Sequence, residues 1–269
     1  MKIWTKKQLM QAVFEHIQAH GPHVNLNHLD VSALTDFSYV FSLYGADTHQ
    51  LTLDVYAGTL SFYEHKEWAE RSRVLSTFQG DISEWDLSHA VNLQSMFEGS
   101  QFNGDISKWN VSKVQNMAKM FKNSHFNQPL TNWDVSSVET MEFMFSESNF
   151  NQPLQAWNPI RLIGARSLFE ASPFNHSIDH WDITSVTDLT DCFRDCAFDQ
   201  PILRWNLEKK HTDFMFIDSG WSTKLGIRNP TWEAVKAHSQ KMWLEQHYIK
   251  STPDAHDDVV LSPSSKKRL

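Results

Sequence analysis

The sequence predicts an α/β fold: a right-handed solenoid of strand–helix coils that stack into a parallel sheet, with a capping helix at each end. Three observations predict it. Aromatic residues recur every 24 residues, each repeat joins an alternating apolar segment to an apolar stripe at helical spacing, and both flanking segments have amphipathic helical patterns. A repeat of this length cannot bury its apolar face alone, so its copies must stack.

The 24-residue period is kept by several residue columns at once, which indicates a tandem repeat rather than chance. Ile and Leu residues and a Met column follow the same step. The aromatic columns are Trp85, Trp109, Trp133, Trp157, Trp181 and Trp205; Phe78, Phe102, Phe126, Phe150, Phe174 and Phe198; and Phe97, Phe121, Phe145, Phe169 and Phe193. We expect these side chains to face the interior of the solenoid.

The first half of each repeat is expected to be a short strand. In the repeat that begins FNQPLTNWDVSSVETMEFMF at residue 126, Leu130, Trp133 and Val135 form an apolar pattern, and Asp134 lies between the last two. Side chains alternate between the two faces of a strand. Trp133 and Val135 would therefore face the core while Asp134 faces outward.

The second half of each repeat is expected to be a short helix. Ser136 and Glu139 have the spacing of a capping box, in which each side chain bonds an unpaired amide at the helix start. Apolar residues then recur at intervals of three and four at Val138, Met141, Met144 and Phe145.

Short polar residues form a further column at the turn between repeats. This column contains Asn103, Asn127, Asn151, Asn175 and Asp199. Because a short amide can bond the backbone of neighbouring coils, we interpret the column as structural.

The repeat pattern divides the chain into six segments. Thr5 and Gln8 open the first helix, Leu29 and Trp85 lie 56 residues apart (the 24-residue period plus 32), and Asn229-Pro230 opens the last helix. The expected segments are an N-terminal capping helix (1–24), a degenerate first repeat (25–45), an insertion (46–77), six repeats (78–217), a C-terminal cap with a helix (218–250) and a disordered tail (251–269).

The repeats at 102–121 and 126–145 resemble those of the BspA-like leucine-rich-repeat proteins of bacteria, and the segment at 26–41 is similar to the opening of that family. The resemblance implies a leucine-rich-repeat-like solenoid, often on bacterial cell surfaces, that binds proteins or host components and performs no chemistry. The repeat at 158–169 departs from the pattern, because Ile160 and Ala165 replace the capping Ser and the second Met.

Composition and charge restrict the function. With 24 Lys and Arg against 32 Asp and Glu, the net charge is −8, which argues against nucleic-acid binding through phosphate neutralisation. No apolar run is long enough to span a membrane, and no secretion signal is evident. We expect a cytoplasmic protein; the alternative is a cell-surface location or secretion by a signal-independent route.

Residues with catalytic or metal-binding potential are scattered. Cys192 and Cys196 occupy core and turn columns, and His176 and His180 occupy positions that other repeats fill with Gly, Gln, Asn or Ala. No hydrolase, metalloprotease or nucleotide-binding motif occurs. The sequence therefore predicts a non-enzymatic protein without metal or cofactor; an enzyme using Glu64, His65 and Glu67 in the insertion is less favoured.

Two surfaces are candidates for binding a protein partner, whose identity the sequence does not indicate. The first, called here the Asp/Asn column, follows each repeated Trp: Asp86, Asn110, Asp134, Asn158, Asp182 and Asn206, with Lys108 and Arg204 beside it. It is interpreted either as a hydrogen-bonded ladder between coils or as the binding face. The second is the insertion, through Tyr56, Tyr63 and Trp68, which alternatively seal the first coil. An adhesin-like surface protein is the alternative function.

Overall fold

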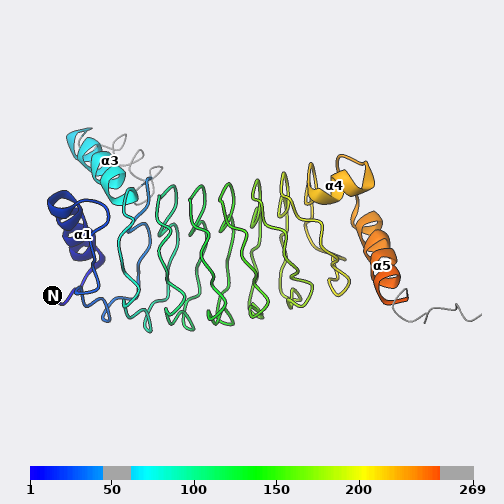
Figure 1. Cartoon of the computed structure of the whole chain (residues 1–269), viewed down its shortest axis with the longest axis horizontal. Coiled ribbons are helices and arrows are strands. Elements are labelled where there is room, and N and C mark those ends of the chain that lie inside the picture. Colours follow the sequence, from blue (N-terminus) through cyan, green and yellow to red (C-terminus); the bar gives the residue numbers. More distant parts are fainter. Residues whose placement is uncertain (45–61, 249–269) are drawn as a thin grey trace, which may run out of the picture.

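The computed structural model describes residues 1–44 and 62–248, with side chains described over 1–44 and 69–245. It is an elongated row of similar coils with helices at both ends (Figure 1). Helices α1 (Lys6–His20) and α3 (Phe62–Ser76) lie at one end of the row, and α4 (Gly220–Leu225) and α5 (Trp232–Tyr248) lie at the other. Tyr56 and the predicted tail at 251–269 lie outside the described residues.

The predicted α/β fold of strand–helix coils is wrong. Over residues 78–217 the structure has neither a strand nor a helix, and each coil is built from successive turns. Neighbouring coils meet at single parallel bridges. The bridges join Asp36 to Asn92, Asn92 to Asn116, Asn116 to Thr140, Thr140 to Gly164, Gly164 to Asp188, and Asp188 to His211. The segment predicted as a strand contains turns, whereas the segment predicted as a helix carries the bridge.

The backbone amides explain why neither element forms. Met141, Phe143, Phe145 and Glu147 donate to carbonyls of the next coil over 2.7–3.0 Å. The residues between them donate within their own coil: Met144 and Ser146 to the carbonyl three positions back, and Glu142 to the hydroxyl of Thr140. An α-helix would commit every amide to the carbonyl four positions back. Alternate amides are instead used for stacking, so the chain forms consecutive turns.

Positive φ angles recur twice in each coil after the first, which has one, and they exclude a helix there. In the coil at 140–148 they lie at Phe143 (57°) and Glu147 (56°). The first column contains Tyr39, Ser95, Lys119, Phe143, Ser167, Asp191 and Phe214; the second contains Gly99, Asn123, Glu147, Ala171, Asp195 and Asp218. A left-handed conformation costs a non-glycine residue roughly 1–2 kcal/mol. The stacking of the coils must offset this cost at each position.

The aromatic columns form the core, as predicted. All six repeated Trp side chains and both Phe columns are buried. Rings of neighbouring coils stack: from Phe97 to Phe121 the centroids are 5.6 Å apart and the planes parallel, and from Trp133 to Trp157 they are 6.3 Å apart. Each ring therefore packs against its copies before and after it in the array.

Most of the repeated Trp side chains also bond the preceding coil. The indole Nε1 of Trp133 donates to the carbonyl of Ile106 at 3.0 Å, and Trp85, Trp109 and Trp157 make the equivalent bond. The indole nitrogens of Trp181 and Trp205 are buried without a hydrogen-bond partner. The hydrogen-bonded register is thus lost toward the C-terminal end of the array, although the ring stacking continues.

The predicted role of the Asn column is confirmed. The Oδ1 atom of Asn103 accepts from the amide of Asn127 at 2.8 Å, and the same bond repeats from coil to coil up to Asp199 at 2.8–3.1 Å. Each side chain thereby pairs an amide at the bend of the next coil that would otherwise lack a partner.

Different devices close the two ends of the array. At the start, Thr5 and Gln8 form a capping box at the predicted beginning of α1. The backbone of Lys2 forms a parallel bridge with that of Asp30 in the first coil. Helix α3 packs on α1, where the Arg71 guanidinium lies 5.0 Å from the Phe14 ring centroid. At the other end, α4 and α5 follow the last coil, and Trp221 of α4 is buried.

The tryptophan hydrogen bond can be tested with a matched pair. Trp133→Phe removes one of the two donors to the carbonyl of Ile106, which also accepts from the amide of Trp109, whereas Trp205→Phe removes an indole nitrogen that has no acceptor. We expect the Trp133 variant to lose about 1–2 kcal/mol more unfolding free energy than the Trp205 variant, measured by urea titration. Equal losses would contradict a role for the bond.

The positive φ angles make a second prediction. Ala171→Gly should leave stability unchanged or raise it by up to about 1 kcal/mol, because glycine adopts φ 51° without strain. Ala156 is also exposed but is not among the positive-φ residues, so Ala156→Gly should cost about 0.5–1 kcal/mol. Thermal unfolding of both variants measures the contrast, and a destabilised Ala171 variant would refute the prediction.

Candidate binding surfaces

The Asp/Asn column is exposed along the whole array, and its side chains close turns. Asp134 Oδ1 accepts from the amide of Ser136 at 3.0 Å, two residues ahead, and Asp86, Asn110, Asp182 and Asn206 do the same. The ladder between coils that the sequence suggested forms at one step, where the amide of Asp182 donates to Asn158 Oδ1. At the other positions the side chain bonds its own turn.

These bonds keep the column charged. Hydrogen bonding by the side chain and backbone of Ser136 lowers the pKa of Asp134. The backbone and side chain of Ser88 lower the pKa of Asp86, and Thr184 lowers that of Asp182 in the same way. The column therefore presents a carboxylate in every second coil and a neutral amide between them. Because the turn bond restrains each side chain, the charges are held at regular spacing.

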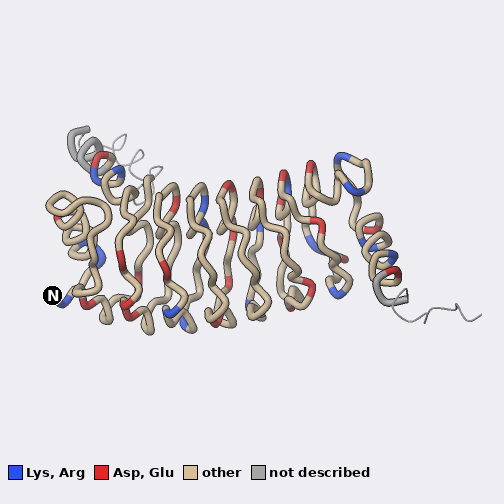
Figure 2. The backbone as a smooth tube through the Cα atoms, viewed as in Figure 1, with Lys and Arg blue, Asp and Glu red and all other residues tan. Residues whose placement is uncertain are grey.

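The two cations predicted beside the column are paired with acids of the preceding coil. Lys108 Nζ lies 3.7 Å from Glu84 Oε1, and Arg204 Nε lies 3.8 Å from Asp179 Oδ2. Both cations are exposed, so such pairs contribute little to stability. Figure 2 shows residues of both charge signs along the row of coils. The surface is mixed rather than basic.

The candidate residues of the insertion are only partly placed. Tyr56 lies outside the described residues, and Tyr63 and Trp68 lie on α3, whose side chains are described only from residue 69. Helix α3 packs against α1 at the N-terminal end of the array. Among the described residues, α3 contacts α1 at the end of the array, whereas the Asp/Asn column extends along the coils.

The cysteines and His180, which were weighed for chemistry, occupy structural positions, whereas the side chains of Glu64, His65 and Glu67 lie outside the described residues. Cys192 and Cys196 are buried free thiols, and burial raises the pKa of Cys196 to about 11, so its reactive thiolate is suppressed. His180 Nε2 lies 2.9 Å from the carbonyl of Trp157. Among the described residues, no group of three or more His, Cys, Asp or Glu could hold a metal, and no helix is long and apolar enough to cross a membrane.

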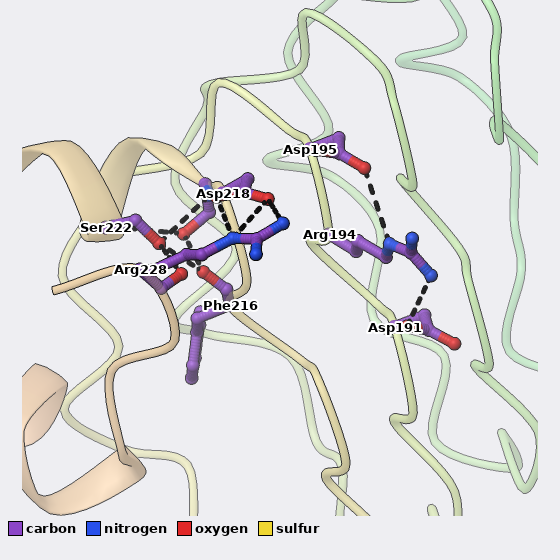
Figure 3. Close-up of polar contacts among 8 residues, drawn as sticks. Asp191, Arg194, Asp195, Phe216, Asp218, Ser222 and Arg228 are labelled. Carbon is purple, nitrogen blue, oxygen red and sulfur yellow. Dashed lines mark hydrogen bonds and ion pairs between the residues drawn. The ribbon is translucent and has the colours of Figure 1, made fainter.

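Sequence reasoning missed a polar cluster at the C-terminal end (Figure 3). The guanidinium of Arg228 makes three hydrogen bonds to the carboxylate of Asp218 at 3.0–3.1 Å, and Ser222 Oγ donates to the carbonyls of Phe216 and Arg228. This cluster fixes the chain just after the last coil. The repeat pattern ends at residue 217, which indicated where the array stops. The contact that Arg228 makes with the last coil could not be inferred from that pattern.

The turn carboxylates predict an acid dependence of stability. Their folded-state pKa values lie below the unfolded value of about 3.9. Their stabilisation is therefore present above about pH 4 and is lost as the pH falls below it. The variant Asp86→Asn/Asp134→Asn/Asp182→Asn keeps the turn acceptor and should lose less stability than the wild type between pH 5 and pH 2, measured by circular dichroism melts. Identical pH profiles would contradict this.

Comparison with known proteins identified one family. No curated protein and no solved structure matched the chain. The family described as "Mycoplasma protein of unknown function, DUF285" matched twice, over residues 67–172 and 163–247. The two matches together span the six repeats at 78–217, the C-terminal part of α3 and most of α5, and they cover more than half of the chain. The protein therefore belongs to the DUF285 family of tandem-repeat proteins.

Proposed function

We propose that the protein is a non-enzymatic repeat protein that binds a protein partner through the Asp/Asn column. One observation carries the proposal: a row of exposed carboxylates and amides extends along the array, and each is oriented by a hydrogen bond. Repeat proteins use such extended columns as binding surfaces. The resemblance of the repeats to BspA-like leucine-rich repeats supports the same function.

Orientation by the turns favours binding because it reduces the entropy lost on association. The Asp134 side chain is already restrained by the hydrogen bond from the amide of Ser136, so it loses less conformational entropy when a partner binds. The alternation of charged and neutral positions favours a partner that places a cation at every second coil. Such a pattern selects its partner mainly by electrostatic complementarity.

The test removes the charge without removing the turn. Wild-type protein is used as bait to identify partners from the native source by mass spectrometry. The variant Asp86→Asn/Asp134→Asn/Asp182→Asn should then recover at least about tenfold less of the principal partner, since each lost ion pair weakens the complex. Its folding should be unchanged, because Asn serves the same turn at Asn110 and Asn206.

A matched control carries the same chemistry at other turns. Asp81, Asp105 and Asp188 also accept from the amide two residues ahead, outside the column. Their triple replacement by Asn should leave partner recovery unchanged. Equal recovery by both variants and the wild type would contradict binding through the Asp/Asn column.

A further inference from the structure

The last coil keeps amide donors that every earlier coil uses for stacking. In the coil before it, four amides donate to the last coil over 2.7–3.0 Å: those of Leu189, Asp191, Phe193 and Asp195. The equivalent residues of the last coil are Thr212, Phe214, Phe216 and Asp218. The amide of Asp218 donates to the carbonyl of Arg228 at 2.9 Å. Within the described part of the chain, the other three have no acceptor.

The chain after the last coil therefore occupies only part of the position that a further coil would take. Arg228 supplies the last of the four carbonyls of that position, and its pairing with Asp218 and Ser222 fixes it there (Figure 3). The chain then turns away into α5. A cleft of about 300 Å³ remains between residues 212–216 and residues 229–233. The three open donors lie on the residues that line one wall of this cleft.

The cleft lining indicates the chemistry of an occupant. Phe214 is 54% exposed, and Pro230 and Trp232 line the opposite wall, so part of the lining is apolar. Asp213 and Glu233 also line the cleft, and the lining contains no Lys or Arg. The open amides lie at alternate residues, and in the earlier coils such amides bond carbonyls at alternate residues of the facing coil. Apolar walls with two carboxylates favour apolar side chains and a cation.

We propose that this edge binds a peptide segment of a protein partner, with apolar side chains and Lys or Arg, which adds to the array as a further coil. The proposal shares the premise that the protein binds other proteins, but it concerns a different surface. The two proposals can therefore be disproved independently. Binding at the edge is measured by the exchange of three backbone amides, and binding by the Asp/Asn column is measured by the recovery of a partner.

The chain itself contains a segment of this kind in the equivalent contact. Residues 114–123, VQNMAKMFKN, lie against the coil at 92–100. There the carbonyls of Asn116, Ala118 and Met120 accept from the amides of the preceding coil at 2.9 Å. The segment carries two Lys residues as well as Met and Phe. A synthetic peptide of this sequence with blocked ends is therefore a suitable probe.

The experiment measures amide exchange by NMR on the full chain with and without this peptide. At saturation, exchange at Thr212, Phe214 and Phe216 should slow at least about tenfold, because each amide gains an acceptor in a less accessible site. Amides of the central coils, such as Phe145, already donate to the next coil and should not change.

Charge variants test the specificity. Asp213→Lys/Glu233→Lys should weaken peptide binding about tenfold and should favour a peptide in which both Lys residues are replaced by Glu. The control Glu15→Lys/Glu139→Lys makes the same charge change at exposed sites outside the cleft lining and should bind like the wild type.

Two results would overturn the proposal. One is the absence of slowed exchange at the three amides at peptide concentrations that saturate any shift. The other is slow exchange of these amides in the free full chain, which would show that another part of the chain or a second copy already fills the edge.

Discussion

The sharing of backbone amides between a coil and its neighbour is the constraint on which the structure depends. In the segment of each coil that follows the bridge, alternate amides close the coil's own turns and those between them bond the next coil, as Met144 and Phe145 illustrate. Turns of this kind require left-handed residues at fixed positions, which explains why Phe143 and Glu147 are strained. No coil can satisfy its backbone alone, so folding of one coil depends on its neighbours.

The side chains follow from that backbone. A fixed distance between coils places identical residues above one another, and flat rings stack efficiently at such a spacing, as in the pair Phe121–Phe145 at 5.7 Å. Polar residues at the bends accept hydrogen bonds from amides that the turns leave without a partner, as Asn127 does from the amide of Asn151. The repeated Trp and Phe residues and the Asn residues at the bends are therefore a consequence of stacking.

The core could be predicted from the sequence, but the local backbone could not. The columns of Trp133 and Phe145 were readable because burial repeats with the period. The intervals of three from Val138 to Met144 suit both a helix and consecutive turns, and the helix was the wrong choice. The left-handed residues include Lys119, Phe143 and Ala171, whose types do not indicate that conformation. The Asp-x-Ser pattern did carry a turn signal at Asp134, which was read as alternation in a strand.

The candidate surfaces, too, could be predicted only in part. Exposure of the Asp/Asn column followed from its place after each buried Trp, whereas its hydrogen bonds depended on turn geometry that the sequence did not disclose. The open edge at Thr212 could not be predicted, because it arises from the direction of the backbone. Each coil before the last donates four amides to the following coil, so the first and last coils need unlike caps. The N-terminal segment and α1 cap the first coil. At the last coil, the carbonyl of Arg228 accepts from one of the four amides, and the other three are left as donors for a further segment.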